Sequence, residues 1–253
     1  MRLIRPMDRR GAARSTVTLA LLMLIVGCAA LALMSVIPTS RSAPIALLAL
    51  SSALGLGVGC AIALRAFSAG RRRTEERGDD LVRLLAPAFD DSYVLIVSPR
   101  LPGVPDDLAA LLVGPPGVRA VIARRWHGRY RVRGRGWEYD TRTRAGWVPC
   151  ITNPSFDART VVQAVTRWAG TALPEAPLPV AGAIAFPRPH SRVALEEPDL
   201  EVVTTDNAPW FAQLIGRVQR MDPQRIGRFV EAVLEAGEAE SRSPSPAPTT
   251  QNA

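Results

Sequence analysis

Apolar residues are concentrated in two long runs near the start of the chain. No charged residue occurs from 15 to 40, and a second uncharged run covers 42 to 64. A helix needs about 20 apolar residues to cross the hydrocarbon core of a bilayer, so each run is long enough. Pro38 and Pro44 lie between them and favour helix ends. The pattern predicts membrane-spanning helices at 15–37 and 45–66, joined by a short external loop at 38–44.

Arginines on either side of these runs predict the orientation of the hairpin. Five arginines occur in the basic segment 1–14 and five between 65 and 77, whereas the connector has only Arg41. Positive flanks favour the cytoplasmic side, so we expect a cell-membrane protein with both termini cytoplasmic. A cleaved signal peptide at the first run is the alternative, and it would leave the second run with the same basic flank. Membrane lipid is the first expected partner, and the charged linker 67–80 is suited to anionic headgroups.

The segment 81–236 shows the spacing of apolar residues that is typical of one mixed domain. Helical periodicity predicts helices at 81–89, 210–218 and 223–235. Another helix is expected to start at Asn153-Pro154, because asparagine is a good N-cap and proline suits the first helical position. The Pro-, Ser- and Thr-rich tail at 237–253 is expected to be disordered.

Short apolar and β-branched runs predict the strands of this domain. The turn Gly114-Pro115-Pro116-Gly117 joins two of them into a hairpin. A fold with strands and helices in this mixture is α/β, with α+β as the alternative, and we expect a small central mixed sheet with flanking helices. The predicted strands are 93–97, 110–113, 118–123, 130–132, a segment around Trp137, 180–186 and 202–204.

Composition limits the chemistry that the chain can perform. All 31 basic residues are arginine, the net charge is +8, and the pI is about 10.7. Three scattered cysteines and two histidines exclude a disulfide framework, a zinc-finger site and a multi-histidine metal centre. The sequence also lacks a Walker A lysine, a GxSxG motif, an HExxH motif and a CxxC motif.

Several short motifs follow one another in a recognisable order. They are LP at 101–102, LLVGPPGV at 111–118, a Trp- and Gly-rich hairpin that ends near Trp137, NPSFDA at 153–158 and VAGAIAF at 180–186. In this order the segment from 81 to about 234 resembles the NERD family, the nuclease-related domain of bacterial proteins. The resemblance implies a restriction-endonuclease-like fold. Members of the family are often tethered to membranes, which agrees with the predicted hairpin.

The resemblance also implies where a nuclease site would lie. Related nucleases use an Asp on one strand and Glu-x-Lys on the next, so that two carboxylates hold Mg²⁺ while the lysine positions the attacking water. Alignment on Gly114-Pro115 places Ala109 at the Asp position, Ile122 at the Glu position and Arg124 at the Lys position. We therefore expect a non-catalytic member without a cofactor. The alternative is a relocated Mg²⁺ site that uses Asp107 and Glu138.

A basic stretch with interleaved aromatic residues suggests a function other than cleavage. Arginine and aromatic side chains together are suited to phosphate contacts and base stacking, although such alternation also occurs on ordinary solvated strands. The first hypothesis is nucleic-acid binding at the membrane, and the second is scaffolding through a cytoplasmic protein partner. The sequence indicates no oligomeric state. The candidate nucleic-acid-binding residues are Arg119, Arg124, Arg125, Trp126, Arg129 and Arg131.

Overall fold

The computed structural model describes residues 1–5, 76, 78–175 and 177–242. The predicted spans at 15–37 and 45–66, the loop 38–44 between them and most of the predicted tail lie outside these ranges. Within the described ranges, no helix combines the length and apolar character needed to cross a membrane. Residues 1–5 and the described residues from 76 onward belong to one compact unit.

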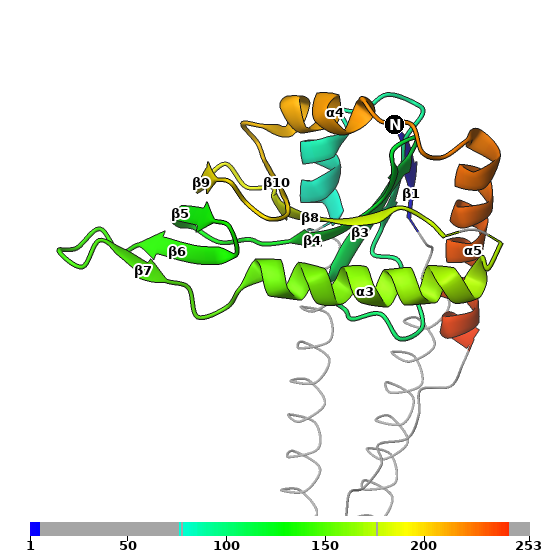
Figure 1. The fold of residues 1–253 in the computed structure, drawn as a ribbon, viewed down its shortest axis with the longest axis horizontal. Helices are drawn as coiled ribbons and strands as arrows, with labels where there is room; N and C mark the ends of the chain where they lie inside the picture. Colours follow the sequence, from blue (N-terminus) through cyan, green and yellow to red (C-terminus); the bar gives the residue numbers. More distant parts are fainter. Residues whose placement is uncertain (6–75, 77, 176, 243–253) are drawn as a thin grey trace, which may run out of the picture. The chain divides into compact units, whose positions relative to one another are not determined.

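A six-stranded mixed sheet lies at the centre of this unit (Figure 1), in the order β1-β2-β3-β4-β8-β10. Strand β3 is antiparallel to both of its neighbours, β2 and β4. Strand β1 is parallel to β2, and β4, β8 and β10 are mutually parallel. The bounds are Arg2–Ile4 for β1, Val94–Val97 for β2, Leu108–Gly114 for β3, Gly117–Ala123 for β4, Val180–Phe186 for β8 and Glu201–Thr204 for β10.

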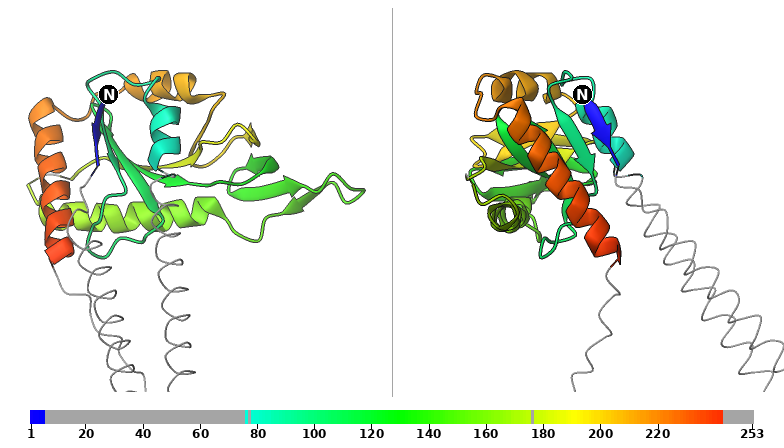
Figure 2. Two further views of the ribbon diagram at one scale, coloured as in Figure 1. Left: turned by 180° about the vertical axis from the view of Figure 1, so that it is seen from behind. Right: turned by 90° about the vertical axis from the view of Figure 1, so that its right-hand side faces the viewer.

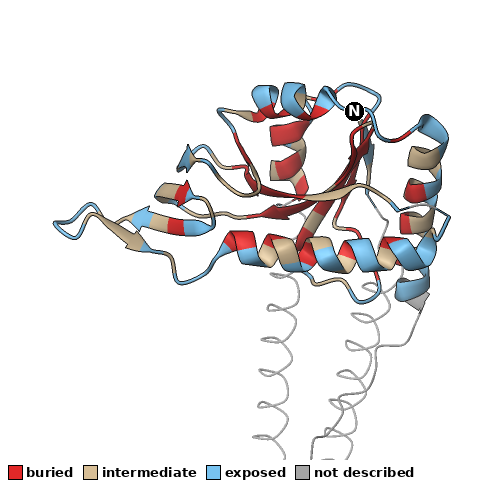
Figure 3. Ribbon diagram, viewed as in Figure 1, coloured by how far each residue is buried: buried red, intermediate tan, exposed pale blue. Residues whose placement is uncertain are grey.

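Helices cover both faces of this sheet (Figures 2 and 3), which explains why β2, β3 and β8 are apolar along their whole length. Alternate residues of β3 point to opposite sides. Leu111 and Val113 belong to the core under α3 (Pro154–Ala172) and α5 (Pro223–Arg242). Ala110 and Leu112 belong to the core under α4 (Ala208–Gly216) and the helix that includes residues 78–85.

A second sheet of four strands extends from one end of the first (Figure 1), in the order β7-β6-β5-β9. Phe186, at the end of β8, packs between the sheets with its ring centroid 5.8 Å from that of Trp126 and 5.6 Å from that of Trp137. The indole N–H of Trp137 donates to Ser155 Oγ at 2.9 Å, which ties this sheet to the start of α3. The bounds are Gly128–Arg133 for β5, Gly136–Asp140 for β6, Trp147–Pro149 for β7 and Ser191–Glu196 for β9.

The structure confirms the mixed α/β class and most of the predicted elements. The turn between Gly114 and Gly117 joins β3 and β4 as predicted. Asn153 caps α3, because its side-chain oxygen accepts hydrogen bonds from the backbone N–H groups of Ser155 at 3.0 Å and Phe156 at 3.3 Å. The apolar run at 180–186 is an interior strand with a parallel neighbour on each side.

Several elements of the fold extend beyond the predicted segments or were not predicted. Residues 2–4, assigned to the basic segment 1–14, form β1 beside β2, a pairing that no local pattern in three residues could indicate. The helix that includes residues 78–85 already contains residues 78–80 of the predicted linker 67–80. Helix α5 continues to Arg242, beyond the predicted domain end at 236, because its last turns contain the good helix formers Ala and Glu. Strands β7 and β9, and the separation into two sheets, were not predicted.

Candidate functional site

The β3–β4 hairpin holds the positions that correspond to the nuclease site in the resemblance. Ile122 is fully buried in the core. Ala109 lies at an irregularity in β3, where the register with β4 shifts between Leu108 and Ala110. Neither the alanine nor the isoleucine side chain has an oxygen atom, so neither can coordinate Mg²⁺. The residues present do not fit the metal that the resemblance implies.

Arg124 follows β4 at the position that corresponds to the lysine. Its backbone N–H donates to the carbonyl oxygen of Ala185 at 2.9 Å, which keeps this segment beside β8. Its guanidinium pairs with Asp107 at 3.0 Å and also with Asp157, and only 17% of the side chain is exposed. Asp157 lies in the first turn of α3, where a carboxylate also interacts favourably with the helix dipole. A cation supplied by the chain itself therefore holds two carboxylates at this end of the hairpin.

The two carboxylates that were predicted as a relocated metal site each pair with a different arginine. Asp107 contacts Arg124, whereas Glu138 on β6 pairs with Arg131, which lies directly opposite on β5. In the part of the chain that the structure describes, no three His, Cys, Asp or Glu side chains are grouped so that they could hold a metal ion. The described residues thus offer the Mg²⁺ alternative no assembled set of ligands.

Every arginine among the predicted nucleic-acid-binding residues has a carboxylate partner. Arg119 lies on the six-stranded sheet, whereas Arg129 and Arg131 lie on the four-stranded sheet, so the structure does not gather the set on one surface. A guanidinium that is already bonded to a carboxylate has fewer donors for a phosphate. The pairs are Arg119–Glu201, Arg124–Asp107, Arg124–Asp157, Arg125–Glu76, Arg125–Asp80, Arg129–Asp140 and Arg131–Glu138.

The interleaved aromatic residues have structural partners. Trp126 is half-buried, and its ring centroid lies 4.8 Å from that of Tyr130 and 5.9 Å from that of Trp137. The guanidinium carbon of Arg131 lies 4.7 Å from the centre of the Trp147 ring, in a cation–π contact. These rings join the sheets or support an arginine within the fold, so they are poor candidates for stacking platforms.

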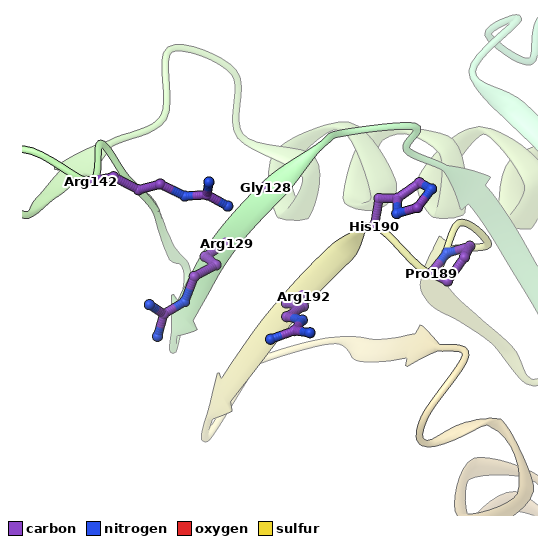
Figure 4. Close-up of a pocket in the computed structure, with 6 residues that line it drawn as sticks. All are labelled: Gly128, Arg129, Arg142, Pro189, His190 and Arg192. Atoms are coloured by element: carbon purple, nitrogen blue, oxygen red, sulfur yellow. The ribbon is translucent and has the colours of Figure 1, made fainter.

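A cavity of about 410 Å³ on the four-stranded sheet brings together residues that the sequence analysis did not connect (Figure 4). Only Arg129 among its lining residues was a predicted site residue. Arg142 comes from the loop between β6 and β7, and Arg192 comes from β9. The run SRVALE at 191–196 does not alternate between polar and apolar residues, so no local pattern identifies β9. The cavity is lined by Gly128, Arg129, Arg142, Pro189, His190 and Arg192.

A second cavity, of about 450 Å³, lies between α3 and the strands β8 and β10. Each of its charged residues has a partner of opposite charge: Arg159 pairs with Asp199 within the lining, and Glu201 pairs with Arg119 on β4. The backbone of Gly182 forms part of the wall, where a β-carbon would lie only 2.9 Å from a methyl group of Val162. This balanced site has no excess charge with which to select a ligand.

Cys150 is the free cysteine of the described residues, and it lies half-buried after β7. Burial raises the pKa of its thiol, and the negative charge of Glu138 raises it further. The thiolate is the nucleophilic form of cysteine, so a raised pKa makes this side chain unreactive near neutral pH. Cys150 is therefore a poor candidate for covalent catalysis.

The comparisons with known proteins add no assignment to this geometry. No family model matches the chain, and no curated protein and no solved structure is significantly similar to it.

Proposed function

We propose that the protein is a non-catalytic binding module, held at the cytoplasmic face of a cell membrane, whose role is to dock a cytoplasmic protein. The observation that carries the non-catalytic part is the pairing of Arg124 with Asp107 and Asp157. In a metal-dependent nuclease, carboxylates at such a position bind a divalent cation. Here they bind a guanidinium, which stays protonated and cannot serve as a general base. Under this proposal the chain is a NERD-like, restriction-endonuclease-like protein that has lost its nuclease site.

Contacts between the segments that come before and after the two uncharged runs support membrane attachment by an even number of spans. Arg5 pairs with Asp79 at 2.5 Å, and β1 is parallel to β2. Residues 5 and 79 therefore lie side by side, with both uncharged runs between them in the sequence. Two segments that pack in one folded unit must lie on the same side of a membrane. A helical hairpin places the segments before and after it in this way. Cleavage after the first run would remove β1 from the sheet, which argues against the signal-peptide alternative.

An exposed apolar stripe on α4 favours protein docking over nucleic-acid binding. Trp210 is 60% exposed and Leu214 is 41% exposed, one turn apart, and Val218 continues the stripe just after the helix. The opposite side of α4 is buried through Phe211 and Ile215. Large apolar side chains that gather at helical spacing on a solvent face are typical of protein-interaction surfaces. By contrast, each arginine that was predicted to bind nucleic acid pairs with at least one carboxylate.

A cleavage assay tests the non-catalytic part of the proposal. The full chain, reconstituted in lipid nanodiscs, is incubated with single- and double-stranded DNA in Mg²⁺ or Mn²⁺, and we expect no cleavage above the background of empty discs. Cleavage that is lost in Asp107→Ala but kept in the neighbouring Asp106→Ala would overturn the proposal in favour of the relocated nuclease. A gel-shift series in increasing salt, with the same DNA, reveals any binding through phosphates.

Site-specific photo-crosslinking tests the docking surface. A photoreactive residue at position 214 is expected to give discrete adducts with a cytoplasmic protein in cells, and the same residue at Arg167, on the exposed side of α3, is expected to give none. Trp210→Ser should abolish the adducts without changing membrane insertion. Equal adducts from both positions would contradict a docking surface on α4.

A further inference from the structure

The cavity on the four-stranded sheet collects positive charge from three separate elements. Arg129 lies on β5, Arg192 on β9 and Arg142 on the β6–β7 loop. Figure 4 shows Arg129 and Arg192 on neighbouring strands and Arg142 reaching from its loop toward β5. His190, just before β9, adds an imidazole to the wall. We call this site the arginine cleft.

The pairing of β5 with β9 places two like charges directly opposite each other. Arg129 is the register partner of Arg192 in this parallel pair of strands. Like charges at opposing positions destabilise a sheet. At the other end of the same pair, Arg133 lies opposite Glu196, and its Nε donates to the carboxylate at 2.7 Å. This pair of strands therefore places opposite charges together at one end and like charges together at the cleft.

Few carboxylates are available to the three guanidinium groups of the cleft. Arg129 contacts Asp140 at 3.3 Å. Within the described residues, the guanidinium groups of Arg142 and Arg192 make no hydrogen bond or ion pair. Three positive charges less one carboxylate leave the cleft with two positive charges. This differs from the rest of the sheet, where Arg131 and Arg133 each have a carboxylate of their own.

We propose that the arginine cleft binds the phosphate group of a small phosphate monoester, or inorganic phosphate itself. The planar guanidinium group matches phosphate oxygens in geometry and charge. A phosphate monoester carries about −1.5 to −2 charges near neutral pH, which balances the excess charge of the cleft. A volume of about 410 Å³ suits a small ligand. A phosphodiester has only one charge for each phosphate, so a nucleic-acid backbone is the poorer match.

The backbone holds Arg142 in place for this role. Its φ angle is +55°, in the left-handed region that residues other than glycine rarely adopt. Its N–H donates to Asp140 Oδ1 at 2.9 Å, and the loop is closed by a hydrogen bond from Thr141 N to Gly146 O at 3.0 Å. Asp140 thus contacts both the guanidinium of Arg129 and the backbone of Arg142, so it holds these two residues in place. Its single negative charge cannot neutralise the three arginines of the cleft.

Calorimetric titration of the full chain in phosphatidylcholine nanodiscs tests the proposal, which does not depend on the proposed docking function. Inorganic phosphate is the probe, and chloride at equal ionic strength is the reference anion. We expect saturable binding of phosphate that weakens about tenfold or more in Arg192→Gln and in Arg142→Gln. The matched control is Arg133→Gln on the same sheet, outside the cleft, which should bind as the natural protein does. Thermal unfolding without phosphate checks the fold, and Arg192→Gln should be at least as stable, since it removes a like-charge pair.

Two further arms identify the source of the phosphate. Stronger association with discs that contain phosphatidic acid, lost in Arg192→Gln, would support the site with a lipid headgroup as its ligand, and phosphate binding without this preference would support a soluble ligand. The proposal is overturned if phosphate binds no better than chloride, or if Arg133→Gln weakens binding as much as Arg192→Gln does. Binding of an oligonucleotide without binding of inorganic phosphate would also overturn it, in favour of a nucleic-acid surface.

Discussion

The two sheets of this protein are stabilised in different ways. The six-stranded sheet is covered by helices on both faces, and β2 is buried at every residue. The four-stranded sheet buries Val132 and Trp137 on one face, while its other face carries arginines and their carboxylate partners. Apolar burial contributes far more to stability than exposed ion pairs do. The first sheet therefore supplies stability, and the second is free to carry charges that can serve binding.

The largest expected effect comes from the aromatic contact that joins the sheets. Phe186 is fully buried, and its ring contacts the rings of Trp126 and Trp137. Phe186→Ala removes both contacts and leaves a cavity between the sheets. We expect a loss of about 3–5 kcal/mol in the free energy of unfolding. Denaturant unfolding followed by tryptophan fluorescence measures it. Phe156→Ala is the control, because Phe156 is 71% exposed and should change stability by no more than about 0.5 kcal/mol.

The hairpin turn of the six-stranded sheet should be nearly as sensitive. Gly117 has a φ of +121°, and a β-carbon there would lie 2.4 Å from the carbonyl oxygen of Pro179. That oxygen accepts a hydrogen bond from Val118 N at 2.9 Å, so it cannot move away freely. Gly117→Ala should cost about 3 kcal/mol. Gly170→Ala, at an open position of α3, should instead stabilise by about 0.5–1 kcal/mol. Equal effects of the two substitutions would contradict the strained turn.

The next largest loss of stability is expected from removal of the buried hydrogen bond between the four-stranded sheet and α3. Ser155→Ala would leave the indole N–H of the buried Trp137 without its acceptor. An unsatisfied buried donor costs about 1–3 kcal/mol. Thr160→Ala on the same helix is the matched control, because its hydroxyl donates to the exposed end of the helix at Phe156 O. Thermal unfolding of the two variants should separate them, and a loss of similar size in both would argue against the bridge.

The comparison of the sheets also explains which parts of the fold can be predicted from the sequence. Strand β8 is recognised because VAGAIAF is apolar on both sides, and α3 is recognised because Asn153 and Pro154 mark its start. Strand β9 was missed, since half of its residues are polar and its partner β5 lies far away in the chain. Strand β1 depends wholly on its pairing with β2 across a long sequence separation. Local patterns report burial, but they do not report pairing.

The candidate sites show the same limit. The absence of metal ligands at Ala109 and Ile122 follows from residue identity once the resemblance is accepted. Whether a given arginine is paired or free depends on carboxylates from other elements, such as Glu201 for Arg119. The sequence therefore identified Arg129 and Arg131 as candidates, but it could not show that Arg129 lies opposite a second arginine, Arg192, whereas Arg131 lies opposite Glu138. Arg142 and Arg192 enter only when the two strands and the loop are brought together.

The ion pairs on the charged face of the second sheet should have small effects. Glu138→Gln breaks a cross-strand pair with Arg131 that is partly exposed, so we expect a loss of about 0.5 kcal/mol. Added salt should reduce this difference further by screening. Denaturant unfolding at low and high salt measures both quantities. A loss as large as that of Ser155→Ala would show that this sheet depends on its charges more than the comparison implies.

The smallest expected effect is on alkaline stability, and it again separates the two regions. Tyr93 directly precedes β2 and is only 6% exposed. Burial raises its pKa, and the charge of Asp90 raises it further. The pKa of Tyr130 on β5 is raised first by burial and then by Cys150. A folded pKa above the unfolded value near 10 favours the neutral phenol, so this stability is complete below pH about 10 and is lost as the pH rises through the folded pKa. Phenolate absorbance should show a late transition that Tyr93→Phe removes. Asp90→Asn should move the Tyr93 transition to lower pH and leave the Tyr130 transition in place. A shift of both transitions would mean that the two tyrosines do not titrate in separate environments.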